Sequence, residues 1–551
     1  MPQPTQDTRS AVGSPAKAVP KGDFGWIRGA GYLSLISLAL GVVGLGLHNL
    51  GNRYFWTDES SSFFTALGWP APGDPPGGLA AIQQTLVTFL DPGLYHLMIR
   101  GWSDLFGTRI ETLRALPFTF FVLYVIALLL WYRRFRLPLI VGTAGVSLMM
   151  VENITPFYAV EVRAYSASLA AAVVLPLVGL WFLDKPSGRR LAGFLVIGLF
   201  LGAMQYMTIS VNLATAALLG FGALKRRASG GVRNLIIGAF ALASWLPLIY
   251  LVTRGWPSGG AEADLNHVRN TVLAYMDAAT VINTLTTNFL SFTALPRTLF
   301  LLLVPALFVA GKIMEGHPSS VLRERRPDTP IFQLWIYVFA LTFSAALVSV
   351  GGFLPWVLGT RWSITEIAGI ALSILGIIAL IRLYAPTALW EKGTVRIVGS
   401  LILMLLVTVG AWRLWNYERP GNSQALDELV PVLVSGESDA PILVDYWIYP
   451  DTRYWVEYSG QFESWRTDWI DRGVMSTEGY VKAGPDEVLA FLSSPSTRML
   501  LKDDEALETL PEPLPQSVEI VYPSDPDFAS PGLSSSPLVL VKTDRSEWFS
   551  S

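Results

Sequence analysis

The chain has 551 residues, of which 52% are hydrophobic and only 15% are charged. A soluble globular protein is charged at about a quarter of its positions, so this composition indicates a membrane protein. The formal net charge of −3 gives no support for nucleic-acid binding, and the lack of cysteine excludes disulfides, cysteine-ligated zinc and thiol catalysis.

Apolar runs of membrane length dominate the chain after a polar start. Residues 1–29 are expected to form a disordered cytosolic tail, and the first apolar run, 32–50, lacks a small-residue cleavage site, which favours a retained anchor. Further runs follow at 113–131, 137–152, 164–183, 191–207, 208–224, 234–252, 296–311, 332–350, 364–383 and 397–415. The sequence therefore predicts a mainly α, polytopic membrane domain over residues 30–416, with about 11 transmembrane helices.

The glycines of GVVGLG, 41–46, lie inside a span, where small residues serve helix packing.

The charge of the loops predicts how these helices are oriented. Basic loops at 133–136, 185–190, 225–233 and 323–326 fall on one side of the count, and the positive-inside rule makes that side cytosolic. The loop 51–112, the loop 253–295 and the C-terminal residues then lie on the external face.

Two external regions have recognisable local patterns. Within the loop 51–112, residues 79–90 and 91–107 have the spacing of amphipathic helices at a membrane interface. After residue 416 the composition turns polar, and we expect a small external α/β domain over 417–551. Strands are predicted at 440–447, 497–502, 517–522 and 537–542, and a helix at 484–494.

Ionisable residues stand at the external membrane edge, where they are costly and often functional. Asp58 and Glu59 follow the first span in RYFWTDESSSFF, and a helix cap accounts for one acid but not for two. Glu161 and Arg163 in EVRAYSASL stand at the same face, where an intrahelical ion pair is an equally good explanation. Together with Arg361 in LGTRWSITE, Arg163 fits an anionic partner such as a lipid phosphate.

The order of these motifs resembles the GT-C superfamily of integral-membrane glycosyltransferases. The external Asp-Glu is followed by DPGLYHLMIRGWSDLFG at 91–107, RALPF at 114–118, EVRAYSASL at 161–169 and an Arg-aromatic pair at 361–362. The likeness covers roughly residues 30–415 and is strongest to bacterial enzymes similar to protein O-mannosyltransferases and lipid A aminoarabinose transferases. It implies a multi-pass inner-membrane enzyme that moves a sugar from a polyprenyl-phosphate donor to a hydroxyl of an envelope lipid, glycan or protein, with inversion.

The resemblance also assigns roles to individual residues. Asp58 matches the catalytic acid of the first external loop, and Glu59 completes the pair. The substrate-binding residues that it implies are Arg361, Arg163, Glu161, Tyr165, Asp91, Tyr95 and His96. Gly93 replaces the family's second proline, and Trp362 replaces its tyrosine. A divalent metal is compatible with some relatives, although the sequence offers no clear set of ligands.

Two other functions remain open at this stage. A polytopic transporter or flippase for lipids or sugars is the alternative function, and it predicts charges near mid-membrane and inverted repeats with interrupted helices. The sequence shows neither feature. A non-catalytic scaffold with an external binding domain leaves the acids of the loop 51–112 unexplained. The transferase is therefore the preferred prediction.

Overall fold

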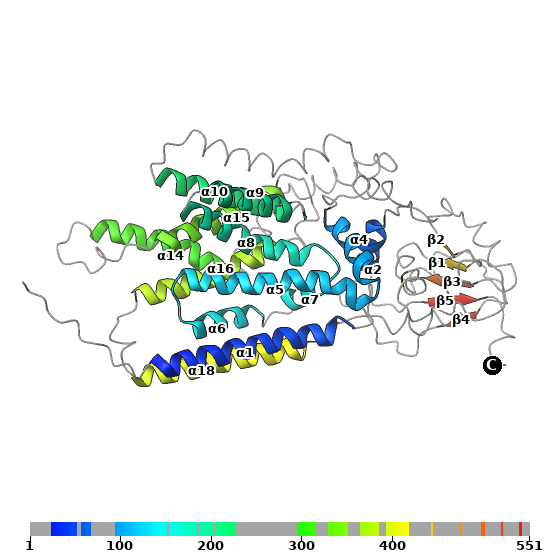
Figure 1. Ribbon diagram of the computed structural model, residues 1–551, viewed down its shortest axis with the longest axis horizontal. Coiled ribbons are helices and arrows are strands. Elements are labelled where there is room, and N and C mark those ends of the chain that lie inside the picture. Colours follow the sequence, from blue (N-terminus) through cyan, green and yellow to red (C-terminus); the bar gives the residue numbers. More distant parts are fainter. Residues whose placement is uncertain are drawn as a thin grey trace, which may run out of the picture.

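The computed structural model describes a bundle of helices and a small sheet at one end of it (Figure 1). It describes residues 24–51, 57–67, 94–150, 154–184, 187–202, 204–205, 208–225, 295–314, 329–350, 364–384, 393–417, 442–444, 454, 474–476, 498–501, 519–521 and 539–542. The helices are α1 (Phe24–Asn49), α2 (Thr57–Ala66), α4 (Leu94–Phe106), α5 (Ile110–Arg134), α6 (Leu139–Met149), α7 (Ile154–Ala159), α8 (Tyr165–Asp184), α9 (Gly188–Gly202), α10 (Thr208–Lys225), α14 (Leu295–Met314), α15 (Thr329–Val350), α16 (Ile364–Tyr384) and α18 (Gly393–Trp415).

The apolar runs of the sequence form helices of membrane character. Four described segments are long and apolar enough to cross a membrane, namely Arg28–Asn49, Ile110–Arg134, Tyr165–Asp184 and Thr394–Trp415. Shorter apolar helices occupy Leu139–Met149, Ser210–Phe221, Leu295–Leu307, Pro330–Ser344 and Ile367–Arg382. These helices confirm the mainly α, polytopic fold class, while the expected span 234–252 and the interfacial helix 79–90 lie outside the described residues.

Helix α8 is the most deeply buried of the four long segments, and a neighbour compensates for its proline. Pro176 has no N–H, so the carbonyl of Ala172, one turn earlier, loses its usual helix donor. The Tyr337 hydroxyl of α15 donates to that carbonyl at 2.7 Å, and Trp131 Nε1 of α5 donates to the carbonyl of Val173 at 3.0 Å. Because lipid offers no hydrogen bonds, these contacts both satisfy α8 and tie it to its neighbours.

The two ends of the bundle carry different contacts. At one end, Arg134 of α5 pairs with Asp184 of α8 at 2.8 Å. At the other end, where α2 and α4 lie, Asn49 Nδ2 donates to the carbonyl of Tyr417 at 2.7 Å and joins the last turn of α1 to the end of α18 (Figure 1). The segments that follow α1 and α18 therefore leave the bundle on the same side.

The C-terminal region contains a five-stranded mixed sheet. Its strands are β1 (Ile442–Val444), β2 (Val474–Ser476), β3 (Arg498–Leu501), β4 (Glu519–Val521) and β5 (Val539–Lys542), in the order β2-β1-β3-β5-β4. Strand β1 is parallel to β2 and β3, whereas β5 is antiparallel to β3 and β4. Four strands lie in the stretches expected from the sequence, and β2 is an addition. The expected helix at 484–494 lies outside the described residues.

Candidate functional site

Helix α2 carries the two acids that follow the first span. It begins at Thr57, so Asp58 and Glu59 stand in its first turn, where the helix dipole favours negative charge. Phe63 and Phe64 are buried one turn further on and hold α2 against the end of the bundle. The backbone places Asp58 beside Glu59, while the Asp58 side chain lies outside the described atoms.

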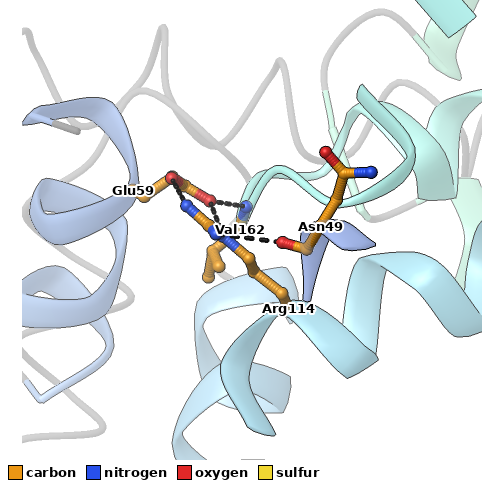
Figure 2. Close-up of polar contacts among 4 residues, drawn as sticks. All are labelled: Asn49, Glu59, Arg114 and Val162. Atoms are coloured by element: carbon orange, nitrogen blue, oxygen red, sulfur yellow. Dashed lines mark hydrogen bonds and ion pairs between the residues drawn. The ribbon is translucent and has the colours of Figure 1, made fainter. Parts of the chain in front are cut away.

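Glu59 is fully buried and forms a bidentate ion pair with Arg114, the fifth residue of α5 (Figure 2). Arg114 Nη2 donates to Glu59 Oε2 at 3.0 Å, and Nε donates to Oε1 at 3.2 Å. The same guanidinium donates through Nη1 to the carbonyl of Asn49 at 3.1 Å, and the backbone N–H of Val162 donates to Glu59 Oε1 at 3.0 Å. Helix α2, helix α5 and the segment between α7 and α8 therefore meet at the Glu59 carboxylate, and Arg114 links this ion pair to the end of α1.

The segment between α7 and α8 brings a second acid and a second arginine to this end. Glu161 is buried and Arg163 is half-buried, and the N–H of Arg163 donates to the carbonyl of Glu161 at 2.6 Å. The guanidinium carbon of Arg163 lies 5.7 Å from the ring centre of Tyr165, within the range of a cation–π contact. The ring of Tyr158 lies 4.6 Å from that of Tyr165 and closes the cluster.

Helix α4 adds two buried polar rings. Burial raises the pKa of Tyr95 well above its usual value, and the negative charges of Glu161 and Glu59 act in the same direction, against Arg163. Burial, assisted by the positive charge of Arg163, lowers the pKa of His96 to about 3. His96 is therefore a neutral imidazole at ordinary pH. The Tyr95 hydroxyl makes no hydrogen bond to any described residue, which leaves it available to a ligand.

The structure thus gathers six of the residues singled out in the sequence at one end of the bundle. They are Glu59, Tyr95, His96, Glu161, Arg163 and Tyr165. Asp91 and Arg361 lie outside the described residues. Arg114 belongs to the quoted RALPF motif but received no role from the sequence, although an arginine at the start of an apolar span is the signal that marks it.

The described part of the chain shows no metal centre, since it holds no group of three or more His, Asp or Glu side chains close enough to bind an ion. What the described groups can do is bind polar ligands. Arg163 provides a positive charge, Tyr95 a hydroxyl, and His96 a neutral ring that can donate one hydrogen bond and accept another.

Comparison with known proteins yields structural neighbours alone. No protein-family model matches the chain, and no curated protein matches it. Two crystal structures of ArnT from Cupriavidus metallidurans are similar in three dimensions, one bound to undecaprenyl phosphate and one in the apo state. The TM-scores are 0.49 and 0.48, with 13% sequence identity in both cases. The matches cover 95% and 94% of this chain and 98% of each ArnT chain. A likeness at this level identifies no reaction or substrate for this chain.

Proposed function

We propose that the chain is an integral-membrane glycosyltransferase that moves a sugar from a polyprenyl-phosphate donor to an acceptor hydroxyl at the external membrane face. The observation that carries the proposal is the convergence of buried ionisable groups at one end of an apolar bundle. Glu59, Arg114 and Glu161 are all inaccessible to solvent there, beside the half-buried Arg163. Such groups are costly to bury and are typical of functional sites.

The ion pair supports a division of work between the two acids of α2. Both oxygens of Glu59 accept hydrogen bonds, so this carboxylate holds α2 against α5 and is unsuited to collecting a proton. Successive helix residues are about 100° apart around the axis, so a holding role for Glu59 and a base role for Asp58 are geometrically separate. We therefore assign Asp58 as the general base and Glu59 as a positioning residue.

The reaction uses two groups of the protein, a general base and a cation. Asp58 takes the proton of the acceptor hydroxyl while the acceptor oxygen forms a bond to the anomeric carbon of the sugar. The bond from that carbon to the donor phosphate oxygen breaks on the opposite face, which inverts the configuration. The polyprenyl phosphate then leaves with the electron pair of the broken bond, and an arginine stabilises its charge. Arg163 is the described candidate, and Arg361 remains an assignment by resemblance.

The remaining residues bind and orient the sugar. The Tyr95 hydroxyl and the neutral His96 ring offer hydrogen bonds to sugar hydroxyls, and Tyr165 presents an aromatic ring beside Arg163. Asp91 completes the set by resemblance. A lipid-linked donor suits an external site because nucleotide sugars are confined to the cytosol. Burial of the prenyl chain in the membrane contributes about 0.8 kcal/mol for each CH₂ group.

The decisive test is transfer from a purified polyprenyl-phosphate sugar by the detergent-solubilised chain. Asp58→Asn keeps the shape of the side chain but removes the base, so we expect turnover to fall by about a hundred- to ten-thousand-fold. Asp104→Asn is the matched control, because the Asp104 side chain on α4 is 68% exposed. Turnover of Asp58→Asn within a few-fold of the native chain would remove Asp58 from the chemistry. A native chain that transfers no sugar but moves the lipid across proteoliposomes would favour the transporter.

A further inference from the structure

One tyrosine of the polar C-terminal region is buried against the membrane domain. Tyr454 has no solvent exposure, and its hydroxyl donates to the carbonyl of Thr108 at 2.8 Å. Its ring packs edge-on against Phe63 of α2, with ring centres 5.5 Å apart. A single side chain therefore touches both α2 and the turn that joins α4 to α5. Its contact with Thr108 in that turn spans 346 residues of the chain.

The local structure of that turn explains how a carbonyl is presented to Tyr454. Helix α4 ends at Phe106 and is followed by Gly107 in the left-handed region (φ 95°), whose N–H donates to the carbonyl of Ser103. Helix α5 starts only at Ile110, and its first helical bond runs to the carbonyl of Arg109. The carbonyl of Thr108 therefore stands outside both helices, where it accepts the tyrosine hydroxyl.

Tyr454 also lies within the electrostatic reach of the buried ion pair. Burial raises the pKa of Tyr454, so the phenol stays neutral, and the charges of Arg114, Glu59 and Glu111 all act on it. The sheet of the C-terminal region stands at the same end of the bundle as α2 and α4 (Figure 1). Tyr454 thus contacts both α2, which carries Asp58, and the turn before α5, which carries Arg114.

We propose that Tyr454 is a positioning residue through which the C-terminal region holds α2 in register with α5 for sugar transfer. The inference rests on the proposed function. The ring of Tyr454 presses on Phe63, one turn beyond Glu59, while its hydroxyl fixes the turn ahead of Arg114. Since a displacement of about 1 Å can reduce turnover a hundred-fold, a contact of this kind suffices to control a base at Asp58.

The docking itself is tested without any assay of transfer, because the chain has no native cysteine. Thr108→Cys is introduced alone and together with Tyr454→Ala, and its labelling rate by a water-soluble maleimide is measured. Loss of the hydrogen bond and of the ring contact should raise that rate about ten-fold. Asp104→Cys is the control, since this exposed position should react equally fast in both backgrounds. Equal rates at Thr108→Cys in the two backgrounds would overturn the inference.

The positioning role is tested by turnover of the full-length variants. Tyr454→Ala should lose about a hundred-fold in kcat with an unchanged KM for the donor lipid. Tyr454→Phe keeps the ring on Phe63 and should recover most of that loss, within about two- to ten-fold of the native rate. Tyr32→Ala removes an exposed tyrosine of α1, remote from the contact, and should leave turnover unchanged.

The two experiments separate the inference from the function on which it rests. Faster labelling of Thr108→Cys together with native turnover in Tyr454→Ala would mean that Tyr454 only docks the C-terminal region. That result would overturn the positioning role. A native chain that transfers no sugar would refute the proposed function, and the labelling result would still report on the docking. Loss of turnover in Tyr454→Ala without recovery in Tyr454→Phe would also contradict the role of the ring.

Discussion

The Glu59–Arg114 pair concentrates the energetics of the site in two side chains. Both are fully buried, so each has lost its water, and the attraction between them offsets that loss only while the geometry is kept. Bidentate contact supplies that geometry, and the N–H of Val162 and the carbonyl of Asn49 satisfy further atoms of the pair. We infer that the pair fixes the arrangement of α2 and α5 rather than adding much stability.

Removal of one partner of this buried pair should therefore cost more stability than removal of one partner of an exposed pair. Glu59→Gln leaves Arg114 as an uncompensated buried charge, so we expect a loss of about 3–5 kcal/mol in the free energy of unfolding. The measurement is thermal unfolding in detergent. Asp184→Asn breaks the partly exposed pair with Arg134 and should cost at most about 1 kcal/mol.

The double variant Glu59→Gln/Arg114→Met checks the cause. It removes both charges and should recover part of the loss caused by Glu59→Gln alone. If the loss of stability in the double variant equals the sum of the losses in Glu59→Gln and Arg114→Met, the two side chains are not coupled.

The sequence singled out the two acids of α2 but not the partners that the structure shows for Glu59. Asp58 and Glu59 stand out because carboxylates at a membrane edge are rare. The contact between Glu59 and Arg114 spans 55 residues, and the contact of Tyr454 with Thr108 spans 346. No local pattern encodes pairings of that length, because they depend on how the intervening loops close. The role of Arg114 and the involvement of Tyr454 therefore emerge only from the folded chain.

At the scale of elements, glycines set how closely α1 and α18 approach. A Cβ at Gly41 would lie 2.7 Å from Ala411 Cα and 2.8 Å from its carbonyl oxygen. A Cβ at Gly44 would meet the ring of Trp415 at 2.3 Å. Van der Waals contact is a main source of helix association in lipid, so these glycines allow the contact that joins the first and last described helices.

Gly41→Ala should accordingly force α1 away from α18. The clash is with backbone atoms that cannot move alone, so we expect a loss of about 1–3 kcal/mol in stability, measured as a lower thermal midpoint in detergent. Gly399→Ala on α18 is the control, because a Cβ there meets nothing within 4 Å and alanine is the better helix former. If both variants unfold at the same temperature, close packing at Gly41 contributes nothing.

Elements were predictable from the sequence where length and hydrophobicity decide them. The expected runs 113–131, 164–183 and 364–383 correspond to helices Ile110–Arg134, Tyr165–Asp184 and Ile364–Tyr384. A run of that length and hydropathy has few alternatives to a membrane helix. Strand β2 was missed because its three residues, Val474–Ser476, show no alternating pattern of their own. It is defined by its pairing with β1.

On the scale of the whole molecule, the two ends of the bundle carry different groups. Helix α5 carries Arg114 in its second turn and Arg134 at its last residue, about 30 Å apart at 1.5 Å per residue. The first arginine belongs to the candidate site, and the second lies in the basic loop 133–136. The hydrogen bond from Asn49 to Tyr417 places the exits of α1 and α18 at the end that holds the site. The C-terminal region and the candidate site therefore share one side of the membrane, whichever side that is.

The positive-inside rule predicts that this shared side is external. Single cysteines in the cysteine-free chain can test it, with an impermeant maleimide applied to intact cells. Asp104→Cys, on α4 at the site end, should be labelled directly, whereas Ser187→Cys, exposed in the basic loop 185–190, should react only after permeabilisation. The reverse pattern would place Glu59 and Arg114 on the cytosolic face. Nucleotide sugars are available there, so the reason for a lipid-linked donor would disappear and the proposed reaction with it.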